Sequence, residues 1–152
     1  MAHIPFDDSI LTWHALEWLP NVWYYVYDVD RQNRIVDALF KFAPGSKAML
    51  HQHKCPYITL VLQGELRFYR PTGELKEIRP TGSYVKGVAN GEPHMEGGGD
   101  QETIVFFSVR NIESELFVFL DAATNQPVVR LTIDDAEAVM QAQGQARWLP
   151  AA

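Results

Sequence analysis

The feature that most constrains the fold is a regular succession of short apolar runs, rich in β-branched and aromatic residues. The runs occupy residues 22–29, 35–42, 57–63, 65–70, 75–79, 102–109, 115–120 and 128–132. Such side chains suit a pleated, half-buried surface, and runs of this length are too short for stable helices. Gly, Pro, Asn and Thr separate the runs, and the segments 71-PTGE-74 and 123-ATNQP-127 predict hairpin turns. The sequence therefore predicts an all-β sandwich or barrel.

One helix is predicted near the C-terminal end, at residues 133–143. Thr132 offers an oxygen atom that can cap the helix N-terminus, and Gly144 is suited to end the helix. Its apolar face includes Ile133 and Met140, and we expect this face to close an open end of the barrel.

Composition and charge limit the kind of protein this can be and the partners it can bind. The 152 residues, 47% of them hydrophobic, are typical of one globular domain. The 13 basic and 19 acidic residues give a net charge of −6, with no basic patch for nucleic acid. Apolar runs such as 116–120 are strand-sized, so no membrane partner is predicted. The single cysteine, Cys55, excludes an internal disulfide, and Asp7 and Asp8 do not suit a secretory signal, so we expect a cytoplasmic protein.

We expect residues 1–152 to form one domain, with a barrel core at about 35–132. Residues 1–30 are expected to form a lid or additional strands, and their helical or extended conformation stays open. The aromatic run 23-WYYVY-27 is predicted to be an edge strand covered by another subunit. A homodimer or homotetramer follows from that prediction.

Two histidines occupy alternate positions of a predicted strand. The side chains of His51 and His53 should point to the same face, about 7 Å apart along the chain. Two imidazoles on one face can bind a single metal ion at about 2.0–2.1 Å. His94 follows a turn containing Gly91 and Pro93 and is the best candidate for a third ligand. A half-exposed strand without a metal would produce the same pattern, so the spacing alone leaves both interpretations open.

Three further residues of ligand type are weaker candidates. His3 and His14 have no ligand residues near them in the sequence and are interpreted as structural or terminal. Cys55 shares the parity of the two strand histidines, which makes a His/His/Cys site conceivable. Pro56 predicts that the strand ends there, and this favours a buried or loop thiol.

The spacing around the histidines resembles the first motif of the cupin family. In chain order the matching residues are Gly45, His51, His53, Tyr57 and Gly64, with five, one, three and six residues between them. Cupins usually carry a glutamate where this chain has Tyr57. Gly82, Gly91 and His94 approximate the second motif of the family. The resemblance covers about residues 35–110 and implies an RmlC-like jelly-roll barrel that binds a metal through the three histidines.

A three-histidine set without the glutamate is similar to that of small cupin dioxygenases that cleave acetylacetone or 2,4′-dihydroxyacetophenone. The C-terminal run from Glu115 to Trp148 also resembles theirs. The resemblance implies a non-haem Fe(II) enzyme that uses O2 to cleave a carbon–carbon bond in a β-diketone or α-hydroxyketone. Three neutral imidazoles would leave a divalent metal with a charge of +2, which favours an anionic enolate as ligand. Zn, Ni, Mn or Cu would also suit such a site.

The pocket around the metal is predicted from strand parity. Tyr57 is expected to point inward and either to hydrogen-bond a substrate oxygen or to serve as a core aromatic. Met49, Phe68 and Phe106 are expected to line the substrate pocket.

The two glutamates that flank His94 at even spacing are also candidates. In a functional role, Glu92 or Glu96 would accept a hydrogen bond from a metal ligand or act as a base. Both could equally be solvated loop acids. A non-catalytic zinc-binding cupin that serves as a sensor or regulatory domain is the competing hypothesis. A sugar isomerase is a third possibility, but the His–Asp or His–Tyr acid–base arrangement it needs is not located in this sequence.

Overall fold

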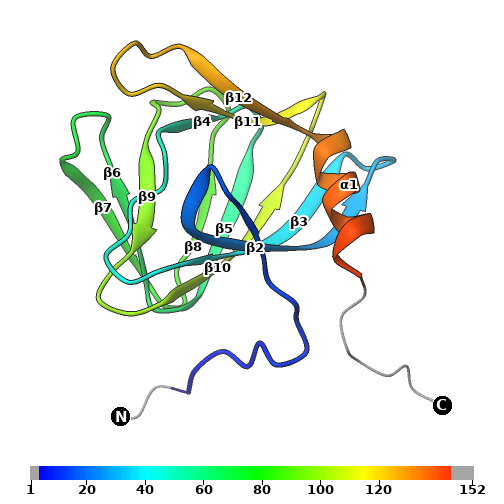
Figure 1. Ribbon diagram of the computed structural model, residues 1–152, viewed down its shortest axis with the longest axis horizontal. Coiled ribbons are helices and arrows are strands. Elements are labelled where there is room, and N and C mark those ends of the chain that lie inside the picture. The colour runs from blue at the N-terminus through cyan, green and yellow to red at the C-terminus, as the bar shows by residue number, and fades with distance from the viewer. Residues whose placement is uncertain (1–3, 145–152) are drawn as a thin grey trace.

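Six antiparallel strands form the larger sheet in the computed structural model, which describes residues 4–144 (Figure 1). Their spatial order is β1 (His14–Leu16), β2 (Leu19–Asp30), β3 (Ile35–Phe42), β10 (Thr103–Val109), β5 (Tyr57–Gln63) and β8 (Tyr84–Gly87). Strands far apart in the sequence are therefore neighbours, as β3 and β10 are, and this arrangement is typical of a jelly roll.

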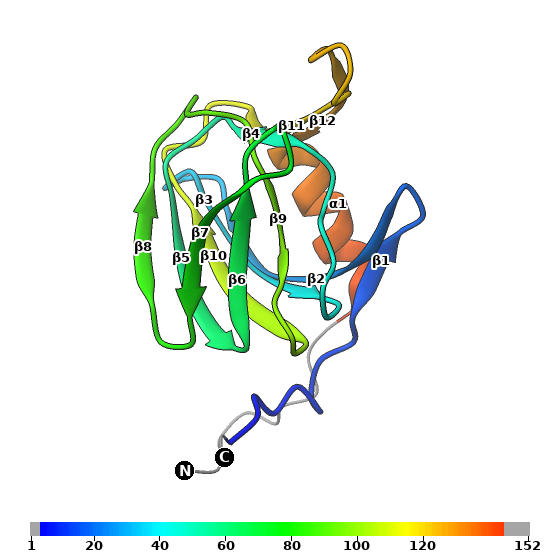
Figure 2. The ribbon, with the colours of Figure 1, turned by 90° about the vertical axis from the view of Figure 1, so that its left-hand side faces the viewer.

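Two three-stranded sheets form the second layer. One has the order β12 (Pro127–Thr132), β11 (Glu115–Leu120) and β4 (His51–His53), and the other has the order β7 (Leu75–Pro80), β6 (Glu65–Tyr69) and β9 (Met95–Gly98). Figure 2 shows β6, β7 and β9 in front of β5, β10 and β3. The layers enclose the core, and the predicted all-β class is confirmed, although the sheets do not close into a continuous barrel.

The main core lies between the two layers. Its fully buried side chains include Phe42 and Phe107 from the larger sheet and Leu66 from β6. A smaller apolar cluster, which includes Leu11 and Leu39, covers the outer face of the larger sheet. The larger sheet therefore buries both of its faces over part of its area.

Both predicted hairpins are present, joining β6 to β7 and β11 to β12. Gly73 in the first turn has a φ of +90°, a conformation that favours glycine. Three short strands at 14–16, 84–87 and 95–98 have no counterpart in the predicted set. β9 includes Gly97, where a Cβ atom would lie 1.7 Å from the carbonyl oxygen of Ser46. The close approach of that loop explains a glycine in a strand, but it leaves no propensity signal in the sequence.

The helix α1 spans Ile133–Gln143, as predicted. Thr132 Oγ1 accepts a hydrogen bond from the Asp135 amide, and the Asp135 carboxylate accepts one from the Thr132 amide, which completes a capping box. The apolar face of α1 packs against the main core. Within the described residues, no helix has the length and hydropathy needed to cross a membrane. His3 and Trp148 lie outside the described residues.

The aromatic run at 23–27 does not lie at a sheet edge, which corrects the prediction. β2 lies between β1 and β3, and Ala15 of β1 is opposite Trp23. Where the pairing of β2 with β1 has ended, the amide side chain of Gln143 accepts a hydrogen bond from the Val26 N–H and donates one to the Val26 carbonyl. Because the chain itself protects this strand, the run no longer argues for a second subunit, and an oligomer stays a prediction.

Candidate metal centre

The strand β4 holds two histidines on its inner face. His51 and His53 are each 4% exposed, whereas Gln52 between them points the other way and donates to the carbonyl oxygen of Gly91. In the antiparallel pairing of β4 with β11, His51 lies opposite Phe119 and His53 lies opposite Phe117. The two-residue repeat of a strand, combined with this apolar neighbour strand, buries both imidazoles side by side.

Backbone pairing brings His94 to the same place. The His51 amide donates to the His94 carbonyl at 3.0 Å, and the His94 amide donates to the His51 carbonyl at 2.9 Å. The loop that precedes His94 is held by a further bond, from the amide of Asn90 to the carbonyl oxygen of His53. The ring centroids of His51 and His94 are 4.7 Å apart, and those of His53 and His94 are 5.3 Å apart. The three histidines therefore form one buried cluster.

Glu96 adds a carboxylate to this cluster. The residue lies in β9, two positions after His94, and is 6% exposed. Its Oε1 atom is 3.2 Å from Nε2 of His51. One donor atom from each of His51, His53, His94 and Glu96 lies within 4.8 Å of the others. The possible donor set therefore contains three imidazoles and one carboxylate, whereas the sequence predicted Glu96 only as a hydrogen-bond acceptor, a base or a solvated acid.

Unpartnered buried atoms test whether these residues fit a metal ion. Both ring nitrogens of His53, Nε2 of His94 and Oε2 of Glu96 are buried without a hydrogen-bond partner. Each such atom costs about 1–3 kcal/mol when left unsatisfied. His51 Nδ1 lies 2.9 Å from the Met49 carbonyl oxygen, a contact that holds a proton on Nδ1 and makes Nε2, which faces Glu96, the nitrogen that would bind a metal. The donor set fits a divalent cation, which would satisfy one ring nitrogen of His53, Nε2 of His94 and the Glu96 carboxylate together.

Burial and charge also set the protonation of the cluster. Burial lowers the pKa of His53 well below its ordinary value and lowers the pKa of His94 to about 4. Burial opposes protonation of His51 too, but the hydrogen bond and charge of Glu96 outweigh it and raise the pKa of His51. His51 in turn lowers the pKa of Glu96 against the effect of burial. Without metal, these shifts favour an ion pair between His51 and Glu96 beside two neutral imidazoles.

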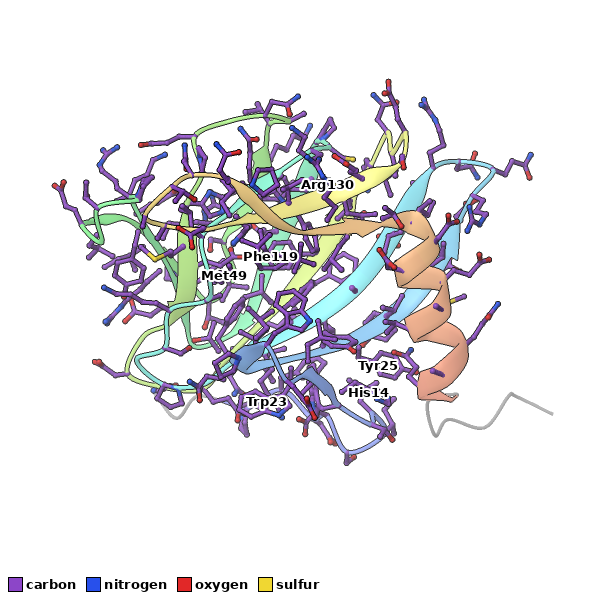
Figure 3. All side chains as sticks on the ribbon, turned by 45° about the horizontal axis from the view of Figure 1, so that its top comes forward. His14, Trp23, Tyr25, Met49, Phe119 and Arg130 are labelled. Carbon is purple, nitrogen blue, oxygen red and sulfur yellow. The ribbon has the colours of Figure 1, made fainter. Side chains whose placement is uncertain are left out.

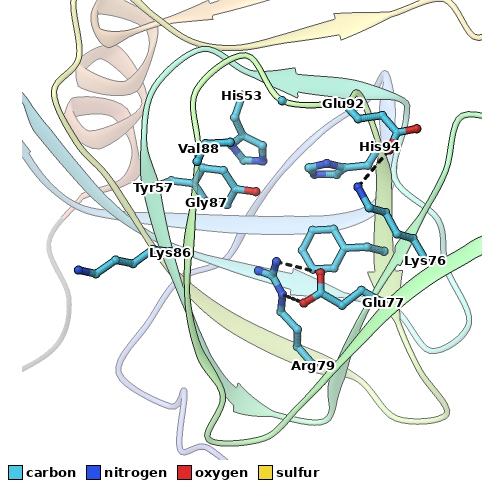
Figure 4. Close-up of a pocket in the computed structure, with 12 residues that line it drawn as sticks. His53, Tyr57, Lys76, Glu77, Arg79, Lys86, Gly87, Val88, Glu92 and His94 are labelled. Atoms are coloured by element: carbon cyan, nitrogen blue, oxygen red, sulfur yellow. Dashed lines mark hydrogen bonds and ion pairs between the residues drawn. The ribbon is translucent and has the colours of Figure 1, made fainter.

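A polar cavity of about 230 Å³ opens beside this cluster. It lies between β7 and β8, which are edge strands of their sheets and do not pair with each other. Figure 4 shows His53, Tyr57, His94 and Arg79 pointing into it. The cavity provides a route from solvent to the histidines that is large enough for a small organic molecule.

Tyr57 forms one wall of the cavity. Its ring stacks on the ring of His53, with centroids 3.6 Å apart and planes 14° apart. Gly87 lies opposite Tyr57 on β8, and a Cβ atom there would lie 2.2 Å from the tyrosine ring. Burial, aided by the negative charge of Glu96, raises the pKa of Tyr57, so the phenol keeps its proton and can donate a hydrogen bond.

Arg79 is a cavity residue that was not predicted from the sequence. It is 7% exposed, donates two hydrogen bonds to the Glu77 carboxylate at 2.9 and 3.1 Å, and donates a third to Thr59 at 2.8 Å. Its guanidinium group lies 4.2 Å from the ring centre of Phe68. A fixed cation therefore faces the cavity. The available signal was weak, since an arginine in a short strand is most often exposed.

The remaining predicted pocket residues have different positions. Phe68 lines the cavity, and its ring is 4.9 Å from that of His94. Phe106 packs on the outer face of the larger sheet instead, and Phe107 is the inward residue, with its ring 6.3 Å from that of His53. Met49 lines neither this cavity nor the smaller one beside His51, and it acts through its carbonyl oxygen.

Glu92 and the other candidate ligands lie apart from the four donors. Glu92 is at the rim of the cavity and pairs with Lys76 at 3.1 Å and with Arg70 at 3.4 Å. Cys55 is buried and donates to the carbonyl oxygen of Glu115 at 3.0 Å. Figure 3 shows His14 well separated from Phe119, the residue opposite His51. None of these side chains belongs to the donor group found among the described residues.

Comparison with known proteins places this fold. Neither protein-family models nor curated protein sequences match the chain. A solved RmlC-like cupin from Ralstonia eutropha is similar, with a TM-score of 0.71 and 17% identity over 90% of this chain and 83% of that one. An acetylacetone dioxygenase from Acinetobacter johnsonii gives a TM-score of 0.68 and 13% identity over 95% of this chain and 93% of that one. At these identities the likeness establishes the fold alone, and the chain has the cupin fold.

Proposed function

We propose that the protein is a metal-dependent cupin dioxygenase that uses O2 to cleave a carbon–carbon bond in a β-diketone or α-hydroxyketone. Fe(II) is the metal we assign, held by His51, His53 and His94 with Glu96 as a further donor. The observation that carries the proposal is a buried donor set with unpartnered atoms, open on one side to a polar cavity. The likeness of the fold to an acetylacetone dioxygenase supports the same reaction class.

Bound Fe(II) would supply Lewis-acid and one-electron chemistry toward a carbonyl substrate and O2. With Glu96 as a ligand, the metal and its donors would carry a charge of +1 rather than +2. Part of the attraction for an enolate then comes from the protein. Lys76 and Lys86 also line the cavity, and Arg79 is its buried cation.

Three other side chains would orient the substrate and keep the site dry. The Tyr57 hydroxyl, which retains its proton, would donate a hydrogen bond to a substrate oxygen. Phe68 and Phe107 present apolar rings on two sides of the histidine cluster. Apolar walls limit the access of water to a reactive intermediate.

Oxygen consumption tests the proposal. The protein is loaded with Fe(II) without air, and uptake of O2 is followed with acetylacetone, other β-diketones and 2,4′-dihydroxyacetophenone. We expect uptake that depends on both the substrate and the iron. The zinc-loaded protein and the His94→Ala variant are the controls, and neither should consume oxygen.

A protein that binds iron in this site but consumes no oxygen with any of these substrates would refute the dioxygenase assignment. One observation favours the second candidate, a zinc-binding sensor or regulatory domain, because four buried donors can complete a closed tetrahedral zinc site. The cavity beside His53 and His94 favours the enzyme, since a closed site needs no opening of about 230 Å³.

A further inference from the structure

The histidine cluster borders a second cavity with a different character. The polar cavity touches His53 and His94, whereas a much smaller space of about 20 Å³ touches His51, His53 and Glu96. Apart from these three residues, every side chain that lines the small cavity is apolar. The cluster therefore has a polar approach on one side and an apolar approach on another.

The size of the small cavity limits its occupant. A single water-sized molecule needs roughly 10–15 Å³, so about 20 Å³ admits a diatomic molecule and excludes an organic carbonyl compound. Apolar cavities in proteins stay dry and take up apolar ligands such as xenon. The polar side chains at this cavity are the four-donor cluster's own His51, His53 and Glu96, so few groups remain to hold a water.

The small cavity shares much of its lining with a larger apolar one. The second space, about 400 Å³, shares Leu19 and four phenylalanines with the first: Phe40, Phe107, Phe117 and Phe119. It extends beneath α1, where Ala136 and Val139 line it. The residues that the two cavities share are all apolar, and the charged side chains of the larger one, Arg130 and Asp135, do not line the small cavity.

We propose that the small apolar cavity is a dioxygen site and that the cavity beneath α1 supplies it. The inference rests on the proposed dioxygenase function and assigns separate approaches to the two reactants. The organic substrate enters through the polar cavity between β7 and β8, and O2, an apolar diatomic gas, reaches the cluster from the side of Val22, Ala48 and Phe107.

Xenon binding tests the site without any turnover. Crystals of the zinc-loaded protein are pressurised with xenon, and we expect an anomalous peak in contact with Val22, Ala48 and Phe107. Ala48→Val adds two methyl groups at the wall of the small cavity and should abolish the peak. Ala15→Val, the same change at an exposed position of β1, should leave it unchanged.

Oxygen kinetics test whether O2 reaches the small cavity by this route. In the iron-loaded protein, Ala48→Val should raise the KM for O2 about tenfold and leave the KM for the diketone unchanged. Because extra methyl groups in a packed core can destabilise it, a second variant acts at the other end of the route. Ala136→Phe on α1 should also raise the KM for O2, and Ala142→Phe, exposed on the same helix, should not.

The outcomes separate this inference from the proposed function. Absence of xenon from the wild-type cavity would overturn the site whatever the activity. Equal KM values for O2 in folded Ala48→Val and Ala15→Val proteins would overturn the delivery route. A wild-type protein that consumes no oxygen would overturn the dioxygenase proposal and the assignment of O2, even if xenon binds.

Discussion

The Glu96→Gln substitution should lower the metal affinity but leave the stability of the metal-free fold nearly unchanged. The substitution preserves the shape of the side chain and removes its charge. Glu96 is 6% exposed, with Oε1 3.2 Å from His51 Nε2 and Oε2 without a partner. Loss of one member of a buried ion pair usually costs about 3–5 kcal/mol because a buried charge remains. Here His51 can lose its extra proton and accept a hydrogen bond from the new amide at the same distance.

We therefore expect Glu96→Gln to change the free energy of unfolding of the metal-free protein by less than about 1 kcal/mol. Metal affinity should fall by about 10–100-fold, the range for loss of a group that binds or orients a ligand. That loss corresponds to about 1.4–2.8 kcal/mol of binding free energy.

Two assays measure the two effects. Urea unfolding in the presence of a chelator gives the stability of the metal-free protein, and competition with a chromophoric chelator gives the zinc affinity. Glu92→Gln is the matched control, because Glu92 lies two residues before His94 as Glu96 lies two after it, but is at the exposed rim. Unchanged zinc affinity in Glu96→Gln, or an equal loss in Glu92→Gln, would refute the role of Glu96.

Three further predictions concern protonation, the cavity wall and the helix. Metal binding should release up to one proton as the pH falls from 8 toward 6, and metal affinity should rise with pH. The reason is that Glu96 raises the pKa of His51, while the other two imidazoles are already neutral. Calorimetry in buffers of different ionisation enthalpy measures the protons released, and either no release or the release of three protons would contradict this prediction. Gly87→Val should displace the Tyr57 ring from its stack without loss of zinc binding, and a crystal structure with the ring in place would contradict the steric argument. Thr132→Ala should lower the free energy of unfolding by about 1 kcal/mol in urea denaturation, and an unchanged midpoint would show that the capping box contributes nothing.

The placement of His51 beside His53 followed from the sequence because it depends on a local rule, whereas the place of His94 beside them depends on a long-range backbone pairing. A strand points every second side chain to one face, which places His51 beside His53. The turn before His94 indicated a residue delivered to a strand start. The helix at Ile133–Gln143 was equally local, with its cap and its terminal glycine close in sequence.

The role of Glu96 could not be separated from that of Glu92 by spacing. Both lie two residues from His94, but β9 begins at Met95, so only Glu96 extends the inward face of a strand. The start of a four-residue strand containing two glycines has no signal in propensity. The position of the buried carboxylate depends on tertiary structure, through the backbone pairing of His51 with His94.

The assignment of Phe106 failed for a different reason. In β10 the run 104-IVFF-107 is apolar at every position, so it contains no alternation from which to choose the inward face. The outer cluster around Leu11 and Leu39 explains this composition, since it buries the outer face of the same strand. Contacts between segments so far apart in the chain are not visible in a local pattern.

The central claim is that three imidazoles and one carboxylate bind a single metal ion. Anomalous diffraction from crystals of the metal-loaded protein tests it most directly. We predict one ion per chain, bound by His51, His53 and His94 at about 2.0–2.1 Å and by Glu96 at about 2.0–2.2 Å. An ion bound elsewhere, or histidine rings that turn away from one another around an ordered water, would contradict the account.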